Sequence, residues 1–161
     1  MLEEQESNLT LNYDINQIIE CQRNRYPVLL IDKITSLIPG EKAIGIKCYT
    51  YNEWFFPAHF EGDPNVPGFV QVESLVQTFI MTFLCLEKYK GMKTNFVSIN
   101  NIKFKRKLVP GDKLVIEANL KSLKRGIAIG DAISNVNGEK ACSAEFVVSL
   151  PEILSRFSPK K

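Results

Sequence analysis

One stretch of this chain, residues 69–90, has apolar residues at almost every position around a helical repeat. A helix that is apolar around its whole circumference is a buried helix, because no face of it can lie in water at low cost. Gly91 is well placed to end this helix, since glycine readily adopts the left-handed conformation that follows helices. The pattern therefore predicts one long central helix that the rest of the chain must cover.

The stretches after this helix have the composition and the turn spacing of β-strands. Among the turns, Asn137-Gly138 is a strong signal for a tight hairpin. Before the long helix, a short helix is predicted over residues 14–24, with Asp14 as its N-cap. The predicted strands are residues 28–37, 43–50, 96–107, 113–123, 127–136 and 139–149.

Together these elements predict an α+β fold in which one antiparallel sheet wraps the central helix, because nothing else can cover so apolar a cylinder. The last four strands are expected to form an antiparallel meander. This arrangement describes a hotdog fold, and hotdog domains commonly pair edge to edge, so we expect at least a homodimer. No linker divides the chain, which predicts a single domain over residues 1–161 with loose tails at residues 1–12 and 155–161.

The composition is that of a globular protein, with 45% hydrophobic and 24% charged residues. The four cysteines are scattered and the chain has one histidine, so we do not expect a metal site. The acidic, polar start does not resemble a secretory signal, and polar residues interrupt the apolar helix, so a membrane span is not expected. Free thiols fit a cytoplasmic location.

The candidate chemistry lies in residues 55–77. His59 is the only histidine, and Glu73 follows it inside the apolar helix pattern. Histidine is the usual general base near neutral pH, although a structural histidine in a turn fits the same position. A carboxyl group in apolar surroundings has a raised pKa, which suits a general acid. The alternative for Glu73 is a carboxylate at a solvent-exposed edge of the helix.

Two further residues lie next to this pair. Gly68 opens the helix, where its backbone N–H and the helix dipole favour a developing oxyanion, although an ordinary Pro-Gly turn has the same sequence. Gln77 lies one turn after Glu73 and is placed to hold its carboxyl group, or an adjacent water, by a hydrogen bond.

Four segments resemble motifs of the FabZ-type β-hydroxyacyl-acyl-carrier-protein dehydratases, and their joint spacing is highly specific. They are RYPVLLID at residues 25–32, FFPAHFEGDPNVPG at 55–68, VESLVQ at 72–77 and FKRKLVPGD at 104–112.

The resemblance implies a hydro-lyase of fatty-acid or related lipid metabolism that works without a cofactor or metal. It would remove water from a (3R)-3-hydroxyacyl thioester on acyl carrier protein and yield the trans-2-enoyl thioester. His59 would take the α-proton, Glu73 of the partner subunit would protonate the departing hydroxyl group, and the N–H of Gly68 would bind the thioester carbonyl. The family forms homodimers with a shared active site, often assembled further into hexamers as trimers of dimers.

The chain departs from the family pattern near the catalytic pair. Ala58 replaces the usual glycine before the histidine, Glu61 replaces a proline, and Asn24 stands where a histidine often precedes the RYP motif. Phe69 stands where a smaller aliphatic residue is common, and it is expected to line and narrow the substrate pocket. These changes bear on the acyl chain length and the substrate head, and they fit either bulk fatty-acid synthesis or a specialised pathway.

Two other functions fit the same sequence. In a hotdog thioesterase a helix carboxylate would activate water against the thioester, and in a non-catalytic subunit the fold would only bind acyl thioesters. Residues 88–107 hold seven bases and no acid, which fits either a docking patch for the acidic acyl carrier protein or an ordinary solvated surface. Nucleic acid is not expected as a partner, since aromatic residues are not interleaved with the bases.

Overall fold

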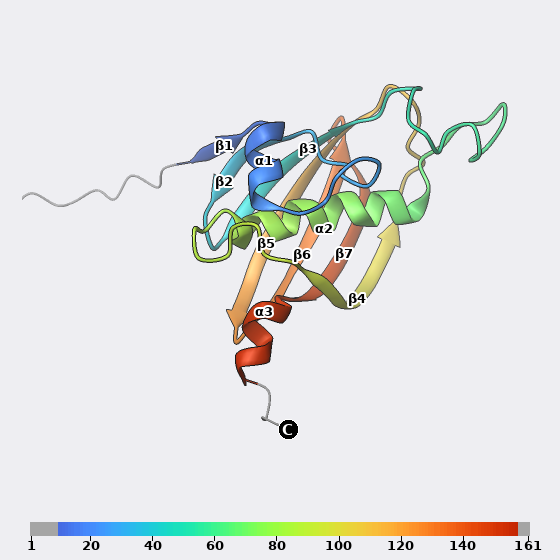
Figure 1. Cartoon of the computed structure of the whole chain (residues 1–161). Coiled ribbons are helices and arrows are strands. Elements are labelled where there is room, and N and C mark those ends of the chain that lie inside the picture. The colour runs from blue at the N-terminus through green and yellow to red at the C-terminus, as the bar shows by residue number, and fades with distance from the viewer. Residues whose placement is uncertain (1–9, 158–161) are drawn as a thin grey trace, which may run out of the picture.

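The computed structural model describes residues 10–157, in which one curved antiparallel sheet wraps a central helix (Figure 1). Seven strands of this part of the chain form the sheet, in the order β1-β2-β3-β5-β6-β7-β4. The α+β fold predicted from the sequence is confirmed. Residues 1–9 and 158–161, which include most of the two predicted tails, lie outside the described residues. The helices are α1 (Ile15–Cys21), α2 (Gly68–Leu84) and α3 (Pro151–Leu154), and the strands are β1 (Leu11–Tyr13), β2 (Lys33–Ile38), β3 (Lys42–Cys48), β4 (Asn95–Phe104), β5 (Lys113–Lys124), β6 (Ile127–Val136) and β7 (Glu139–Ser149).

α2 is the centre of the fold, and 14 of its 17 residues are buried. The hydroxyl groups on its sheet side need no outside partners: those of Ser74, Thr78 and Thr82 donate to carbonyl oxygens of the helix itself. The prediction of a buried central helix is confirmed. The three residues of α2 that stay partly or fully exposed are Gly68, Phe69 and Glu73.

The end of α2 lies at Leu84, earlier than the predicted end at residue 90. Residues 85–91 form turns, and Gly91, with a φ of 71°, belongs to these turns and does not directly follow the helix. The turns bring the chain back onto α1, where the N–H of Gly91 donates to the carbonyl oxygen of Cys21 at 2.8 Å. Contacts with a distant helix therefore override the local helical pattern.

The position of β4 also differs from the prediction. β5, β6 and β7 form a meander, but β4 lies beyond β7 at the edge of the sheet, and β3 takes the place beside β5. The outer edge of β4 has no strand partner in the described part of the chain. The prediction that β4 starts a four-strand meander is therefore wrong. Strand order depends on contacts between distant segments, which a local sequence pattern does not contain.

The chain before α1 is more ordered than the sequence indicates. Leu11–Tyr13, which overlap the predicted tail, pair with β2 as the short strand β1. α1 begins after Asp14, as predicted. Oδ1 of Asp14 accepts from the N–H of Gln17 at 3.0 Å, and Oε1 of Gln17 accepts from the N–H of Asp14 at 2.9 Å. This reciprocal pair is a capping box, which satisfies two donors at the beginning of the helix.

Candidate active site

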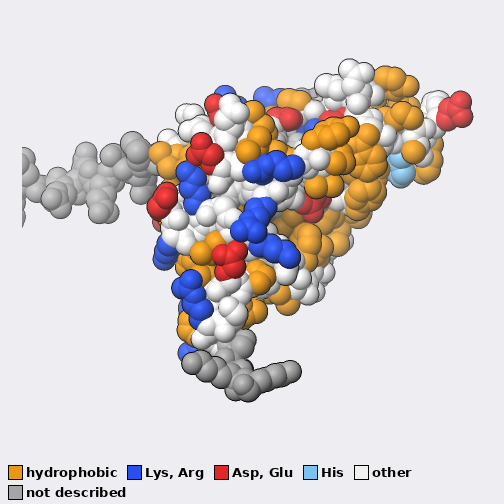
Figure 2. Space-filling view, viewed as in Figure 1, with side chains coloured by type: hydrophobic (Ala, Val, Ile, Leu, Met, Phe, Trp, Pro, Cys, Tyr) orange, Lys and Arg blue, Asp and Glu red, His pale blue; other side chains and the backbone are white. Residues whose placement is uncertain are grey.

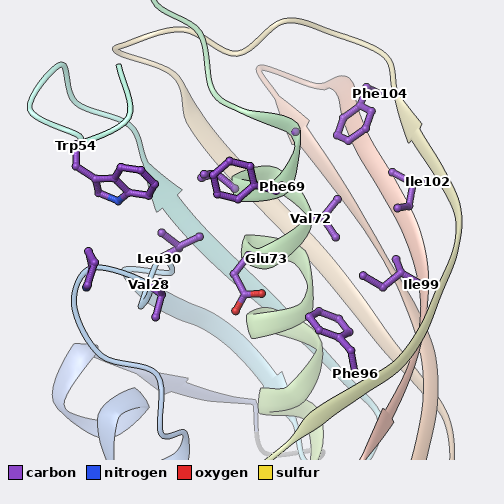
Figure 3. Close-up of a pocket in the computed structure, with 13 residues that line it drawn as sticks. Val28, Leu30, Trp54, Phe69, Val72, Glu73, Phe96, Ile99, Ile102 and Phe104 are labelled. Carbon is purple, nitrogen blue, oxygen red and sulfur yellow. The ribbon is translucent and has the colours of Figure 1, made fainter. Parts of the chain in front are cut away.

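An apolar cavity of about 710 Å³ opens along the side of α2 that the sheet leaves uncovered (Figure 3). Its walls come from α2, from the turn before β2, from the loop before α2 and from β4. Glu73 is the one charged residue among those that line it. Figure 2 shows apolar side chains gathered on the same side of the molecule. The apolar walls include Val28, Leu30, Trp54, Phe69, Phe96 and Phe104.

Two amides hold the carboxyl group of Glu73. Its Oε1 accepts hydrogen bonds from Nε2 of Gln77 at 2.8 Å and from Nδ2 of Asn24 at 3.2 Å. Burial raises the pKa of Glu73, and the hydrogen bonds from Gln77 and Asn24 offset this only in part, although they favour the ionised form. Glu73 therefore stays protonated to a higher pH than an exposed glutamate, as a general acid requires.

Gln77 anchors this arrangement and is itself fully buried. Its Nε2 also donates to the carbonyl oxygen of Val28 at 2.6 Å, and its Oε1 accepts from the N–H of Leu30 at 2.8 Å. These bonds hold a turn against α2, and β2 consequently begins at Lys33 instead of the predicted residue 28. The hydrogen bond from Gln77 to Glu73 that the helical spacing predicts is present.

His59 lies on the irregular loop that projects from the body of the molecule before α2 (Figures 1 and 2). Its Nδ1 lies 2.9 Å from the carbonyl oxygen of Asn65. A carbonyl oxygen can only accept, so this contact places the ring proton on Nδ1 and leaves Nε2 with a free lone pair. The ring also stacks on Phe60, with 4.2 Å between ring centroids. The loop therefore presents Nε2 as the atom that can act as a base.

His59 and Glu73 do not share a cavity within one chain. His59 lines a second cavity of about 490 Å³, which Glu73 does not reach. Gly68 and Phe104 line both cavities, so the beginning of α2 and the end of β4 stand between them. A single copy of the chain therefore does not assemble the catalytic pair that the sequence indicates.

Gly68 begins α2 between the two cavities. The N–H of Val70 donates to the carbonyl oxygen of Pro67 at 3.1 Å, whereas the N–H groups of Gly68 and Phe69 have no partner within residues 10–157. Free N–H groups at the beginning of a helix attract a carbonyl oxygen that gains negative charge. A Cβ on Gly68 would lie 2.9 Å from Cζ of Phe104, so a larger residue here would force this exposed ring to move. The glycine therefore lets the ring of Phe104 lie against the beginning of α2 and leaves the N–H of Gly68 without a side chain beside it.

The bases between residues 88 and 107 do not form one patch. Lys88 lies beyond the end of α2, whereas Lys105 lines the His59 cavity at the other end of this helix, whose 17 residues span about 25 Å. Arg106 and Lys107 also line the His59 cavity, and both form ion pairs with nearby acidic residues. Of these bases, residues 105–107 are therefore the ones that line the His59 cavity.

Two features of the site were not predicted from the sequence. Asn24 reaches Glu73 from 49 residues away, and no local spacing could indicate that contact. β4 carries large apolar side chains that a single chain leaves exposed, among them Phe96 and Phe104. For β4 a signal exists, because exposed apolar residues along an edge strand mark a surface that is covered by something else.

Comparison with known proteins places the chain in a family. A sequence model of the FabA-like domain matches residues 23–145. The chain belongs to the FabA-like family. The 3-hydroxyacyl-[acyl-carrier-protein] dehydratase FabZ of Clostridium acetobutylicum is 42% identical over 135 residues, which cover 84% of this chain and 96% of that protein. The FabZ of Syntrophomonas wolfei is 39% identical over 140 residues, which cover 87% of this chain and 97% of that protein. The resemblance to FabZ-type dehydratases is confirmed.

Solved structures share the architecture of this FabA-like chain. The dehydratase heterocomplex ApeI:P from Xenorhabdus doucetiae aligns with a TM-score of 0.73 at 12% identity, covering 89% of this chain and 97% of that chain. The PaaI protein of E. coli aligns with a TM-score of 0.56 at 16% identity, covering 74% and 78%. Identities this low show the hotdog fold alone. Within residues 10–157, no helix is both long enough and apolar enough to cross a membrane.

Proposed function

We propose that this FabA-like protein removes water from a (3R)-3-hydroxyacyl thioester and forms the trans-2-enoyl thioester, as a hydro-lyase of fatty-acid or related lipid synthesis. The observation that carries the proposal is Glu73, a carboxyl group whose pKa is raised by burial in an apolar cavity large enough for an acyl chain. The similarity to the FabZ dehydratases supports the same reaction.

The reaction poses two difficulties, because the α-proton is weakly acidic and hydroxide is a poor leaving group. Nε2 of His59 takes the α-proton, and the electron pair moves toward the thioester carbonyl, whose oxygen the N–H of Gly68 stabilises. Glu73 gives its proton to the 3-hydroxyl group, so that the C–O bond breaks and water leaves. Proton exchange with solvent then restores both residues.

The active site requires a second copy of the chain. His59 and Glu73 line different cavities, and the apolar walls of the Glu73 cavity are open in one chain: Phe69 is 65% exposed and Trp54 is 48% exposed. The outer edge of β4 has no strand partner among the described residues and is available to pair with a second copy. We infer a homodimer in which His59 of one chain meets Glu73 of the other, with trimers of such dimers expected from the family resemblance.

Mixing two inactive variants tests this shared site. His59→Ala and Glu73→Gln should each be inactive, because every site of such a dimer lacks either the base or the acid. When the two variants are refolded together, a mixed dimer contains one site with neither defect. Random mixing should restore about a quarter of the native activity. Inactivity of the mixture, with mixed dimers demonstrated by native mass spectrometry, would contradict the shared site.

A second assay distinguishes the reaction from its alternatives. The protein is incubated with 3-hydroxyacyl thioesters of several lengths, on acyl carrier protein and on coenzyme A, while enoyl absorbance and free thiol are followed. Enoyl product without thiol supports dehydration. Thiol release would instead identify a thioesterase, and the absence of both products would identify a non-catalytic acyl-binding subunit.

Acyl carrier protein is the partner we propose for the His59 cavity. Three consecutive bases, residues 105–107, line this cavity, and Lys105 is exposed. Attraction to an acidic carrier would mainly raise the association rate and would weaken with salt. All four cysteines are free thiols, which supports a cytoplasmic location, and we take the chain over residues 1–161 as one functional domain.

A further inference from the structure

Asn24 contacts Glu73, although the two residues are 49 positions apart in the sequence. Its Nδ2 donates to Oε1 of Glu73 at 3.2 Å, and Gln77 donates to the same oxygen at 2.8 Å. Oε2 of Glu73 has no hydrogen-bond partner among residues 10–157. The two oxygens of one carboxyl group therefore have different surroundings.

This difference determines which oxygen carries the proton. In a protonated carboxyl group, one oxygen bears the hydrogen and the other is a carbonyl oxygen that only accepts. An oxygen that already accepts two N–H hydrogen bonds is the carbonyl oxygen. The transferable proton of Glu73 therefore lies on Oε2, the oxygen that remains available to a ligand in the cavity.

The main chain that presents Asn24 is itself held in place. Nη1 of Arg25 donates to the carbonyl oxygens of Gln22 at 2.7 Å and of Asn24 at 2.8 Å, and Nη2 donates to the carbonyl oxygen of Ile19 at 3.0 Å. A side chain presented by a rigid segment can orient a reacting group without being ordered during the reaction.

Asn24 also lines the cavities that lie between Glu73 and two cations, Arg23 and Lys93. A cavity of about 210 Å³ behind Glu73 is lined by Asn24 and Thr94, and both residues line a further cavity of about 220 Å³ that Arg23 and Lys93 also line. Among described residues, Arg23 and Lys93 are the only other charged groups lining these cavities or the apolar one. A cation beside the carboxyl group would favour its ionised form, whereas an amide orients it without adding charge.

We propose that Asn24 is a positioning residue, which together with Gln77 makes Oε1 of Glu73 the acceptor and Oε2 the oxygen that delivers the proton. The inference rests on the proposed dehydration. In that step the O–H bond at Oε2 breaks and the proton passes to the 3-hydroxyl group. The C–O bond then breaks, and its electron pair leaves with the water molecule.

The variant Asn24→Leu tests this role, because it keeps the size of the side chain and removes the donor. We expect kcat to fall about 10- to 100-fold with little change in KM. The alkaline limb of the pH–rate profile should move to higher pH, because loss of the donor raises the pKa of Glu73 further and Glu73 must be protonated to act. Asn24→Asp should move the limb in the same direction, since a second carboxylate disfavours ionisation.

The matched control is Asn119→Leu, which removes an exposed amide that donates to the carboxylate of Asp131 at 3.1 Å on the sheet surface. It should change neither kcat nor the position of the limb. A fall in kcat for Asn24→Leu without any movement of the limb would indicate a merely structural role and would overturn the proposal.

A second readout does not depend on turnover. The infrared C=O band of protonated Glu73, isolated by subtracting the spectrum of Glu73→Gln, should shift to higher wavenumber in Asn24→Leu, because the carbonyl oxygen loses a donor. An unchanged band would overturn the role of Asn24. A shifted band in a protein that dehydrates no thioester would support the role of Asn24 toward Glu73 and reject the proposed function instead.

Discussion

The two sides of α2 differ: one packs against the sheet, and the other carries Glu73 and lines a cavity. On the sheet side, Phe79 is fully buried and stacks on Phe146 of β7, with 5.8 Å between ring centroids. On the pocket side, Phe69 is exposed and Glu73 is held by a residue 49 positions away. One chain completes the packing of the first side and leaves the second open. Glu73, whose pKa burial raises, therefore lies on the side that one chain leaves open to a cavity.

The largest expected effect is the loss of activity on replacing His59, which lies on the loop before α2. His59→Ala should lower kcat/KM about 10²- to 10⁴-fold, since it removes the base. The free energy of unfolding should change by about 1 kcal/mol or less, because His59 lies on a projecting loop and is only partly buried. Steady-state kinetics and urea unfolding check the two halves of this prediction. Near-normal turnover would show that another group is the base.

A substitution on the sheet side of α2 should instead lower the stability of the protein. Phe79→Ala should lower the free energy of unfolding by about 3–5 kcal/mol, because it leaves a cavity between α2 and the sheet. Phe69→Ala is the matched control on the pocket side. Its side chain lines an open cavity and does not pack against the sheet, so within one chain the loss should be smaller. Both values come from urea unfolding at one protein concentration. Equal losses for the two variants would remove the distinction between the sides.

The smallest effect concerns the pH dependence of stability. Burial raises the pKa of Glu73 in the folded state above its ordinary value of 4.5, so the folded protein binds this proton more tightly than the unfolded chain. The stabilisation is complete below the unfolded pKa and is lost as pH rises through the folded pKa. The native protein should therefore lose stability relative to Glu73→Gln as pH rises above 4.5. Parallel curves of unfolding free energy against pH would contradict the raised pKa.

Local patterns predicted the features that depend on near neighbours. The burial of α2 follows from apolar residues around its circumference, and the start of α1 follows from Asp14 as its N-cap. The hydrogen bond between Gln77 and Glu73 follows from their positions one turn apart. Each of these depends on residues within about one turn of one another, so the order of residues is enough to predict them.

By itself, the sequence therefore determined a buried helix that carries one carboxyl group, with a single histidine on the loop before it. Only the tertiary structure decided that β4 borders β7, that α2 ends at Leu84, that Asn24 reaches Glu73, and that His59 lines a different cavity. Periodicity and capping depend on a few neighbouring residues, whereas strand order, cavity walls and a contact across 49 residues depend on the path of the whole chain.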